Sequence, residues 1–397
     1  MKFITFLFIL FFSSDLLFAQ DDRSQMPNSL QRTYFEVNLG SINYNFGASQ
    51  FEALPDYKFQ SVEVPHFAVR LVLYGYDFNK YIAAQISYMR PVYWVSYTYT
   101  NANYTQKSSV WMNVAGLSIK TKFPIVKNVS VFSEFGLGII TRHGGVSYSG
   151  LTVVKDASYT SFLLGGGFKY DLSTNRSLLL SYVYSPEKSS VSQPATSFVS
   201  AGFSYHLHSL IKEKVLDSPK KSMIQPKHLF QIGYSSLIFG YGINNSFSKI
   251  PIFWGGDAEV NNGVSFNYQR NIFHGTRFFS LNWGIGASFW QSNIQKERFF
   301  TLSAYPVFKF NLLNTKSFDA YLYYSIAGPS FISKTVIDGI DTGKKFTFQD
   351  NMGVGFLTGE NRSYNVEFKI GHYSNGNLFT TNGGVKIPFT VNLGYAF

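Results

Sequence analysis

The chain has no cysteine, few charged residues and no long apolar run beyond its N-terminus. None of its 397 residues is cysteine and only 14% are charged. The lack of cysteine excludes disulfides, a thiol nucleophile and a lipid-modified N-terminal cysteine. After the first 19 residues no run of about 18 apolar residues occurs, which excludes a membrane-spanning helix. If the chain enters a membrane, it therefore does so with strands.

The first 19 residues have the pattern of a secretory signal peptide. Lys2 precedes a Phe/Ile/Leu block that extends to about Phe12, and Ala19 offers a cleavage position. We expect residues 1–19 to be the signal peptide and residues 20–32 to be a loose N-terminal segment of an exported protein.

Aromatic residues are abundant where charges are scarce. They make up 18% of the chain, with 27 Tyr and 41 Phe, and they occur in short stretches of alternating apolar and polar residues. This composition is typical of an outer-membrane β-barrel, whose aromatic girdles lie at both membrane interfaces. The terminal Leu-Gly-Tyr-Ala-Phe resembles the signal that such barrels present to their assembly machinery. A soluble β-sandwich is the alternative.

The net charge of +11 indicates an acidic neighbour or a generally basic surface. In an outer membrane the acidic neighbour would be lipopolysaccharide phosphate. No basic helix or nucleic-acid-binding motif occurs, so we expect no nucleic-acid partner.

Alternation predicts eight strands in each half of the chain. In residues 128–141, for example, Phe135 and Leu137 lie on one face while Glu134 and Gly136 lie on the other. The first eight predicted strands cover 33–44, 61–74, 81–93, 109–123, 128–141, 158–172, 176–184 and 197–208. The second eight cover 228–241, 256–271, 277–292, 298–310, 318–333, 345–357, 363–375 and 386–397.

A polar break separates the two sets of strands. Residues 211–227 carry five lysines and two prolines and show no alternation. An even-stranded barrel returns both of its ends to one side of the membrane, which places this break in the periplasm. We predict an all-β chain of two tandem eight-stranded antiparallel transmembrane β-barrels, at 33–208 and 228–397, joined by a periplasmic linker at 209–227. One sixteen-stranded barrel is the alternative.

The last-but-one predicted strand carries two polar residues on its apolar face. Tyr364, Phe368 and Ile370 share that face with His372 and Ser374, because side chains two apart in a strand point the same way. The pair falls at the outer end of the strand, facing lipid. A serine with a histidine in reach is an activated nucleophile for acyl transfer. The alternative is an interfacial histidine beside an ordinary loop serine.

The sequence around this pair resembles the lipid A 3-O-deacylase (PagL-type) family. The resemblance rests on His-Tyr-Ser-Asn-Gly at 372–376, Asn-Gly-Gly at 382–384, Ala-Gly-Pro-Ser at 327–330, Asp-Gly at 338–339, Phe-Thr-Phe-Gln-Asp at 346–350 and Gly-Val-Gly at 353–355. It covers about 318–397. The N-terminal half resembles only a generic small outer-membrane β-barrel.

The resemblance implies an eight-stranded outer-membrane barrel that removes the ester-linked 3-hydroxyacyl chain at position 3 of lipid A. Family members use a His-Ser-Glu triad on the barrel exterior. By position, Ser374 is the nucleophile, His372 the general base and Asn382 an oxyanion-hole residue, while Asn375 follows the nucleophile. The family's glutamate is absent, because Lys386 occupies its position.

Asp350 is a candidate for the missing acid. If the two strands before and after Glu360 pair around that residue, Asp350 lies opposite Ile370 and diagonal to His372, about 7 Å away. It would then orient the imidazole. The alternative is an aspartate that orders a strand end.

The sequence therefore predicts a Gram-negative outer-membrane serine esterase that acts on lipid A, and hence remodels lipopolysaccharide. The alternative is a non-catalytic barrel with a structural or binding role, which kept the deacylase fold but lost its acid. No histidine, aspartate and glutamate have metal-site spacing and no phosphate-binding motif occurs, so we expect neither metal nor cofactor. The expected partners are lipid A and the membrane. Acyl-chain preference and oligomeric state stay open.

Overall fold

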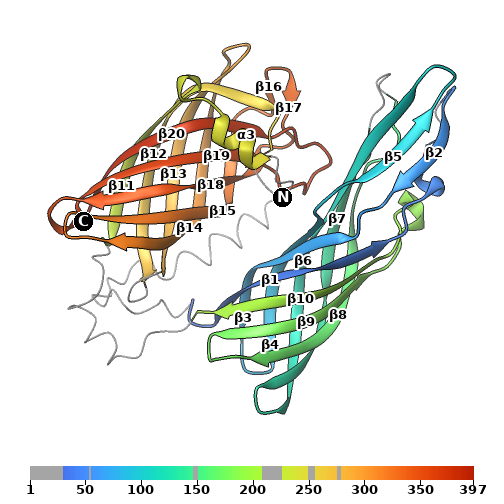
Figure 1. Cartoon of the computed structure of the whole chain (residues 1–397), viewed down its shortest axis with the longest axis horizontal. Helices are drawn as coiled ribbons and strands as arrows, with labels where there is room; N and C mark the ends of the chain where they lie inside the picture. The colour runs from blue at the N-terminus through green and yellow to red at the C-terminus, as the bar shows by residue number, and fades with distance from the viewer. Residues whose placement is uncertain (1–29, 53–54, 146–150, 208–225, 249–254, 275–278) are drawn as a thin grey trace.

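The computed structural model describes residues 30–52, 55–145, 151–207, 226–248, 255–274 and 279–397. The predicted signal peptide and most of the predicted linker lie outside these residues. Within them the chain forms two closed eight-stranded antiparallel barrels, one for each half of the sequence (Figure 1). The prediction of two tandem barrels is confirmed. No helix in the described part of the chain is long and apolar enough to cross a membrane.

The N-terminal barrel closes in the order β1-β3-β4-β6-β7-β8-β9-β10. Its strands are β1 (Thr33–Tyr44), β3 (Phe67–Asp77), β4 (Ile82–Pro91), β6 (Thr105–Val126), β7 (Val129–His143), β8 (Ala157–Asp171), β9 (Arg176–Ser185) and β10 (Thr196–His206). Two further strands, β2 (Lys58–Glu63) and β5 (Val95–Thr100), pair with each other and extend the sheet from β6. They project beyond the barrel in Figure 1.

One predicted strand is wrong. The strand expected over 61–74 is divided into β2 and β3 by Val64, Pro65 and His66. Proline has no backbone N–H to donate to a ladder, so the strand ends there. The sequence analysis also missed β5, which follows β4 after a short interruption.

The C-terminal barrel closes in the order β11-β12-β13-β14-β15-β18-β19-β20. Its strands are β11 (His228–Ser236), β12 (Ala258–His274), β13 (Phe279–Ser292), β14 (Arg298–Asn314), β15 (Phe318–Ile332), β18 (Phe346–Thr358), β19 (Tyr364–Ser374) and β20 (Val385–Ala396). A small hairpin, β16 (Val336–Ile337) and β17 (Ile340–Asp341), lies between β15 and β18.

The first strand of this barrel is shorter than expected. β11 ends at Ser236 rather than 241, and a single 3₁₀ turn and the short helix α3 (Gly242–Ser248) follow. Beyond the end of β11, its two neighbours pair directly with each other, Ala258 with Val385 and Glu259 with Lys386. This pairing closes the barrel above the short strand.

Loop lengths indicate which end of the C-terminal barrel faces the outside of the cell. Connections at the end that holds both termini of the C-terminal barrel are short, such as 315–317 and 359–363, whereas those at the other end include 237–257, 333–345 and 375–384. Outer-membrane barrels have short periplasmic turns and longer extracellular loops. The long loops therefore face the outside of the cell.

Side chains alternate between a polar lumen and an apolar exterior. On β7, Phe135 and Leu137 are exposed on the outside, whereas Glu134 points inward and is 3% exposed. Inside, the Glu134 carboxylate accepts hydrogen bonds from the Arg70 guanidinium, one at 3.1 Å. Such cross-lumen bonds stabilise the barrel, because a buried charge without a partner is costly.

The two barrels lie side by side (Figure 1). The rings of Phe35 on β1 and Phe308 on β14, both on barrel exteriors, lie 5.5 Å apart edge to face. At the other end of the barrels, the Asn113 amide on β6 donates to the carbonyl of Asn377 at 2.9 Å. The exterior of one barrel thus contacts the exterior of the other.

Candidate functional site

The row of residues on β19 faces outward, as predicted. Tyr364 is 60% exposed and Phe368 is 36% exposed on the barrel exterior, while Tyr373 on the opposite face is buried and bonds to the Thr301 hydroxyl inside the lumen. His372 is on the outer row but only 5% exposed. The expectation that it simply faces lipid is therefore corrected, since other parts of the chain cover it.

Asp350 lies directly across from His372. The register of β18 and β19 pairs Asp350 with His372 and Met352 with Ile370, so the expected pairing of Asp350 with Ile370 is wrong by two residues. The turn between the strands is centred on Asn361, one residue later than assumed, because Glu360–Arg362 form a 3₁₀ turn. In the observed register the acid is closer to the histidine than the predicted diagonal position.

The carboxylate of Asp350 has one oxygen for the histidine and one for the backbone. Its Oδ2 lies 3.5 Å from His372 Nε2, and its Oδ1 accepts the Ala327 N–H at 2.5 Å. Ala327 lies in an irregular part of β15, between Ser325 and Gly328, with φ of +51°. This bulge turns an N–H outward, where it fixes the carboxylate beside the imidazole.

Ser374 is the last residue of β19 and begins a tight turn. Two residues along a strand place its Cα about 7 Å from that of His372, on the same face. Gly376 and Asn377 follow with φ of +62° and +55°, and the Gly376 nitrogen lies 3.5 Å from Ser374 Oγ. The turn brings backbone N–H groups to the side of the serine.

Asn375 and Asn382 order the loop that follows. Asn382 Oδ1 accepts the Asn375 backbone N–H at 2.9 Å, and Asn382 Nδ2 donates to Asn377 Oδ1 at 2.5 Å. The Asn375 side chain is fully buried and donates to the Thr381 carbonyl. Both ends of the Asn382 amide are thus engaged within the loop, and its predicted oxyanion role stays a prediction.

Lys386 pairs with His372 from the other side. It lies opposite His372 in the register of β19 and β20, and its Nζ is 3.3 Å from Glu259 Oε1 and 3.4 Å from Asn245 Oδ1 of α3. The outer row therefore reads Asp350, His372, Lys386 and Glu259 across four strands. The sequence analysis missed Glu259, because β12 meets β20 only where the intervening β11 has ended.

These residues are of the types that acyl transfer by a serine requires. A carboxylate fixed beside an imidazole orients the ring and stabilises its cation, and the imidazole can take the proton of a serine hydroxyl in reach. Lysine cannot orient a histidine in this way, so Lys386 is excluded as the acid. In the described residues no group of three or more His, Cys, Asp or Glu side chains could hold a metal ion.

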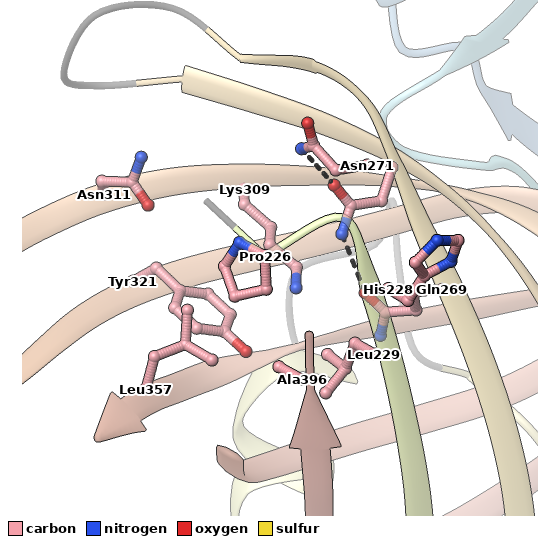
Figure 2. A pocket seen from close by; sticks show the side chains of 11 residues that line it. Pro226, His228, Leu229, Gln269, Asn271, Lys309, Asn311, Tyr321, Leu357 and Ala396 are labelled. Atoms are coloured by element: carbon pink, nitrogen blue, oxygen red, sulfur yellow. Dashed lines mark hydrogen bonds between the residues drawn. The ribbon is translucent and has the colours of Figure 1, made fainter. Parts of the chain in front are cut away.

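A cavity inside the C-terminal barrel lies away from these residues. It is at the periplasmic end of the lumen, and polar side chains hydrogen bond along its wall (Figure 2). Its lining includes His228, Gln269, Asn282, Lys309 and Tyr321. None of the outer-row residues lines it, so the lumen and the candidate site are separate.

Three solved structures resemble part of the chain. Among solved structures, the outer membrane enzyme PagL is 15% identical with a TM-score of 0.30, covering 43% of this chain and 99% of that one. Neisserial surface protein A is 16% identical with a TM-score of 0.29, covering 44% and 97%. Ail of Yersinia pestis is 15% identical with a TM-score of 0.28, covering 44% and 99%. No curated protein matches the chain.

Two families match along the sequence. Residues 4–206 match the outer membrane protein beta-barrel domain, and residues 261–396 match the lipid A 3-O-deacylase (PagL) family. The resemblance drawn from the motifs of the C-terminal half is confirmed. The chain belongs to the outer membrane protein beta-barrel family, its second barrel matches the PagL family over residues 261–396, and it is an outer-membrane protein of Gram-negative bacteria.

Proposed function

We propose that the C-terminal barrel is a serine esterase that removes an ester-linked 3-hydroxyacyl chain from lipid A. The observation that carries the proposal is the direct pairing of Asp350 with His372, with Oδ2 at 3.5 Å from Nε2, two residues before Ser374. The family match over residues 261–396 supports the same chemistry. An acid in register with the histidine offers what the missing family glutamate would supply.

In the proposed reaction Ser374 attacks the acyl carbonyl while His372 takes its proton. Asp350, anchored by the Ala327 N–H, orients the ring and stabilises the imidazolium that forms. Asn382 is the proposed donor to the negative charge that develops on the carbonyl oxygen, once its amide leaves Asn377 Oδ1. His372 then protonates the departing sugar hydroxyl. In the second half of the reaction His372 takes a proton from water, which attacks the acyl-serine ester. His372 then returns the proton to Ser374 Oγ as the fatty acid leaves.

The location of the site fits a substrate in the outer leaflet. His372 and Ser374 lie on the barrel exterior, at the end with the long loops. Lipid A enters such a site sideways from the membrane, with its acyl chains against the barrel wall. The net charge of +11 favours the approach of its phosphates.

A second candidate is a non-catalytic barrel pair with a structural or binding role. Two observations favour it: Lys386 occupies the position of the family's acid, and His372 is only 5% exposed. On this alternative Asp350 orders the end of β18 and has no part in a reaction.

Mass spectrometry of lipid A distinguishes the two. Cells that express the wild type should lose one 3-hydroxyacyl mass from lipid A, and cells that express Ser374→Ala should not. Ser317→Ala, at an exposed periplasmic turn, is the matched control and should behave as the wild type. Heat-dependent gel mobility verifies that all three proteins fold. Identical lipid A spectra for wild type and Ser374→Ala would rule out the esterase.

A further inference from the structure

Two outward-facing residues of the N-terminal barrel are buried. Asn113 on β6 and Thr141 on β7 pair with each other on the barrel exterior, and they are 1% and 0% exposed. On the same strands and the same face, Leu117 and Leu137 are 63% and 50% exposed. Something other than their own barrel therefore covers Asn113 and Thr141.

The covering element is the loop that follows Ser374. Asn113 Nδ2 donates to the carbonyl of Asn377 at 2.9 Å, and Thr141 Oγ1 donates to the carbonyl of Leu378 at 3.4 Å. Both acceptors lie in residues 375–384, which connect Ser374 to β20. The N-terminal barrel thus holds the loop that shapes the candidate site.

The His372 and Asp350 side chains are covered although they lie on the barrel exterior, at 6% and 14% exposure. One neighbouring element is the helix α3, whose Asn244 side chain donates to the carbonyls of Gly371 and Ile387. A lipid in the membrane would have to displace a covering segment to reach His372.

We propose that the outer face of the N-terminal barrel at Asn113 and Thr141 is a docking surface for the loop 375–384 and closes the esterase site. The barrels must separate in the plane of the membrane to admit lipid A. The inference rests on the proposed function. The hydrogen bonds described between the N-terminal barrel and the loop run from side chains to two backbone carbonyls, so the two can part without unfolding either barrel.

Cross-linking the two barrels tests the closure. The chain has no cysteine, so Thr141→Cys with Leu378→Cys introduces a single pair of thiols. A short, reducible bifunctional methanethiosulfonate should join them, and the joined protein should deacylate lipid A at least about tenfold more slowly than the same protein after reduction. Thr160→Cys with Leu378→Cys is the control, because Thr160 is exposed on the exterior of β8 and should not cross-link. Failure to cross-link Thr141→Cys with Leu378→Cys, or a measurable rate that is equal before and after reduction, would overturn the closure.

Loosening the contact should have the opposite effect. Asn113→Ala with Thr141→Val removes both hydrogen bonds and should raise the rate about threefold to tenfold. The matched control is Asn43→Ala with Thr160→Val. It changes two exposed residues on the exterior of the same barrel and should leave the rate unchanged. A lower rate for Asn113→Ala with Thr141→Val would mean that the N-terminal barrel contributes to the active form of the site, which contradicts closure.

A labelling experiment separates this inference from the esterase proposal. Ser374→Cys should react with a membrane-permeant maleimide faster in the Asn113→Ala, Thr141→Val background than alone. Faster labelling together with no deacylation by any variant, the wild type included, would support closure and reject the esterase. Equal labelling would reject closure whatever the lipid A spectra show.

Discussion

On the proposed function, removing the charge of Asp350 should slow ester hydrolysis without weakening substrate binding. Asp350→Asn keeps the size of the side chain and its ability to accept the Ala327 N–H, so the local structure should persist. It removes the negative charge that faces His372 Nε2. The imidazole becomes a cation only after it takes the serine proton, so the lost interaction belongs to the transition state and not to the bound substrate.

The size of the effect follows from the distance. At 3.5 Å, and with an effective dielectric constant of about 20, a unit charge pair is worth about 5 kcal/mol. The dipole of the asparagine and water entering the site would recover about half of this, leaving about 2.5 kcal/mol. Since 1.36 kcal/mol is a factor of ten, kcat should fall about 10²-fold while KM stays within about threefold.

The assay is release of 3-hydroxy fatty acid from lipid A by purified protein in detergent micelles. Asp156→Asn is the matched control, since Asp156 lies 3.0 Å from His143 in the N-terminal barrel and should not affect the rate. Adding Lys386→Glu to Asp350→Asn should raise kcat at least about tenfold above that of Asp350→Asn alone, because position 386 lies opposite His372 on β20. An unchanged kcat for Asp350→Asn would refute the role of this carboxylate.

Three further predictions concern the frame around the site. Arg70→Ala should destabilise the N-terminal barrel by about 3–5 kcal/mol in urea unfolding, because Glu134 keeps a buried charge without its main partner, whereas the exposed Lys107→Ala should cost less than about 1 kcal/mol. Burial raises the pKa of Asp338, but hydrogen bonds from the neighbouring loop outweigh it and hold the pKa below the ordinary 3.8. The folded loop at 333–345 should therefore be protected from protease above about pH 4 and lose protection as the pH falls through that lowered pKa; Asp338→Asn should remove this pH dependence. Gly376→Ala should lower kcat about threefold to tenfold without unfolding the barrel, because a φ of +62° strains any residue with a Cβ just after the nucleophile.

Alternation made most of the fold predictable. In a closed barrel each strand residue faces either lumen or exterior, so the pattern of Phe135, Leu137, Glu134 and their neighbours is set by their own two-residue period. The polar segment at 211–227 interrupts this pattern and so indicated two barrels. These signals are local in sequence, which is why they could be recognised without a structure.

Pairings that depend on distant residues could not be predicted as well. The register of β18 against β19 depends on a 3₁₀ turn centred on Asn361, and an error of one residue in its centre shifts each pair by two. The contact of Glu259 with Lys386 requires that β11 end early. The contact between Asn113 and Asn377 joins β6 to a loop of the other barrel, and neither segment carries a sequence pattern that predicts it.

An antiparallel sheet explains how an esterase could keep its chemistry with its acid on another strand. Each residue of β19 has a lateral neighbour on β20 and another on β18, and His372 has Lys386 on one side and Asp350 on the other. Exchanging the side that holds the carboxylate changes no strand and no loop length. On the proposed function it also changes which ring nitrogen is used. Asp350 approaches Nε2, so Nδ1 would take the proton of Ser374, because one imidazole nitrogen cannot bind the acid and accept the serine proton at once. A carboxylate at 386 would approach the ring from the opposite side. The single variant Lys386→Glu, which keeps Asp350, should therefore deacylate more slowly than the wild type and than the double variant with Asp350→Asn, because its two carboxylates would hold both ring nitrogens away from the serine.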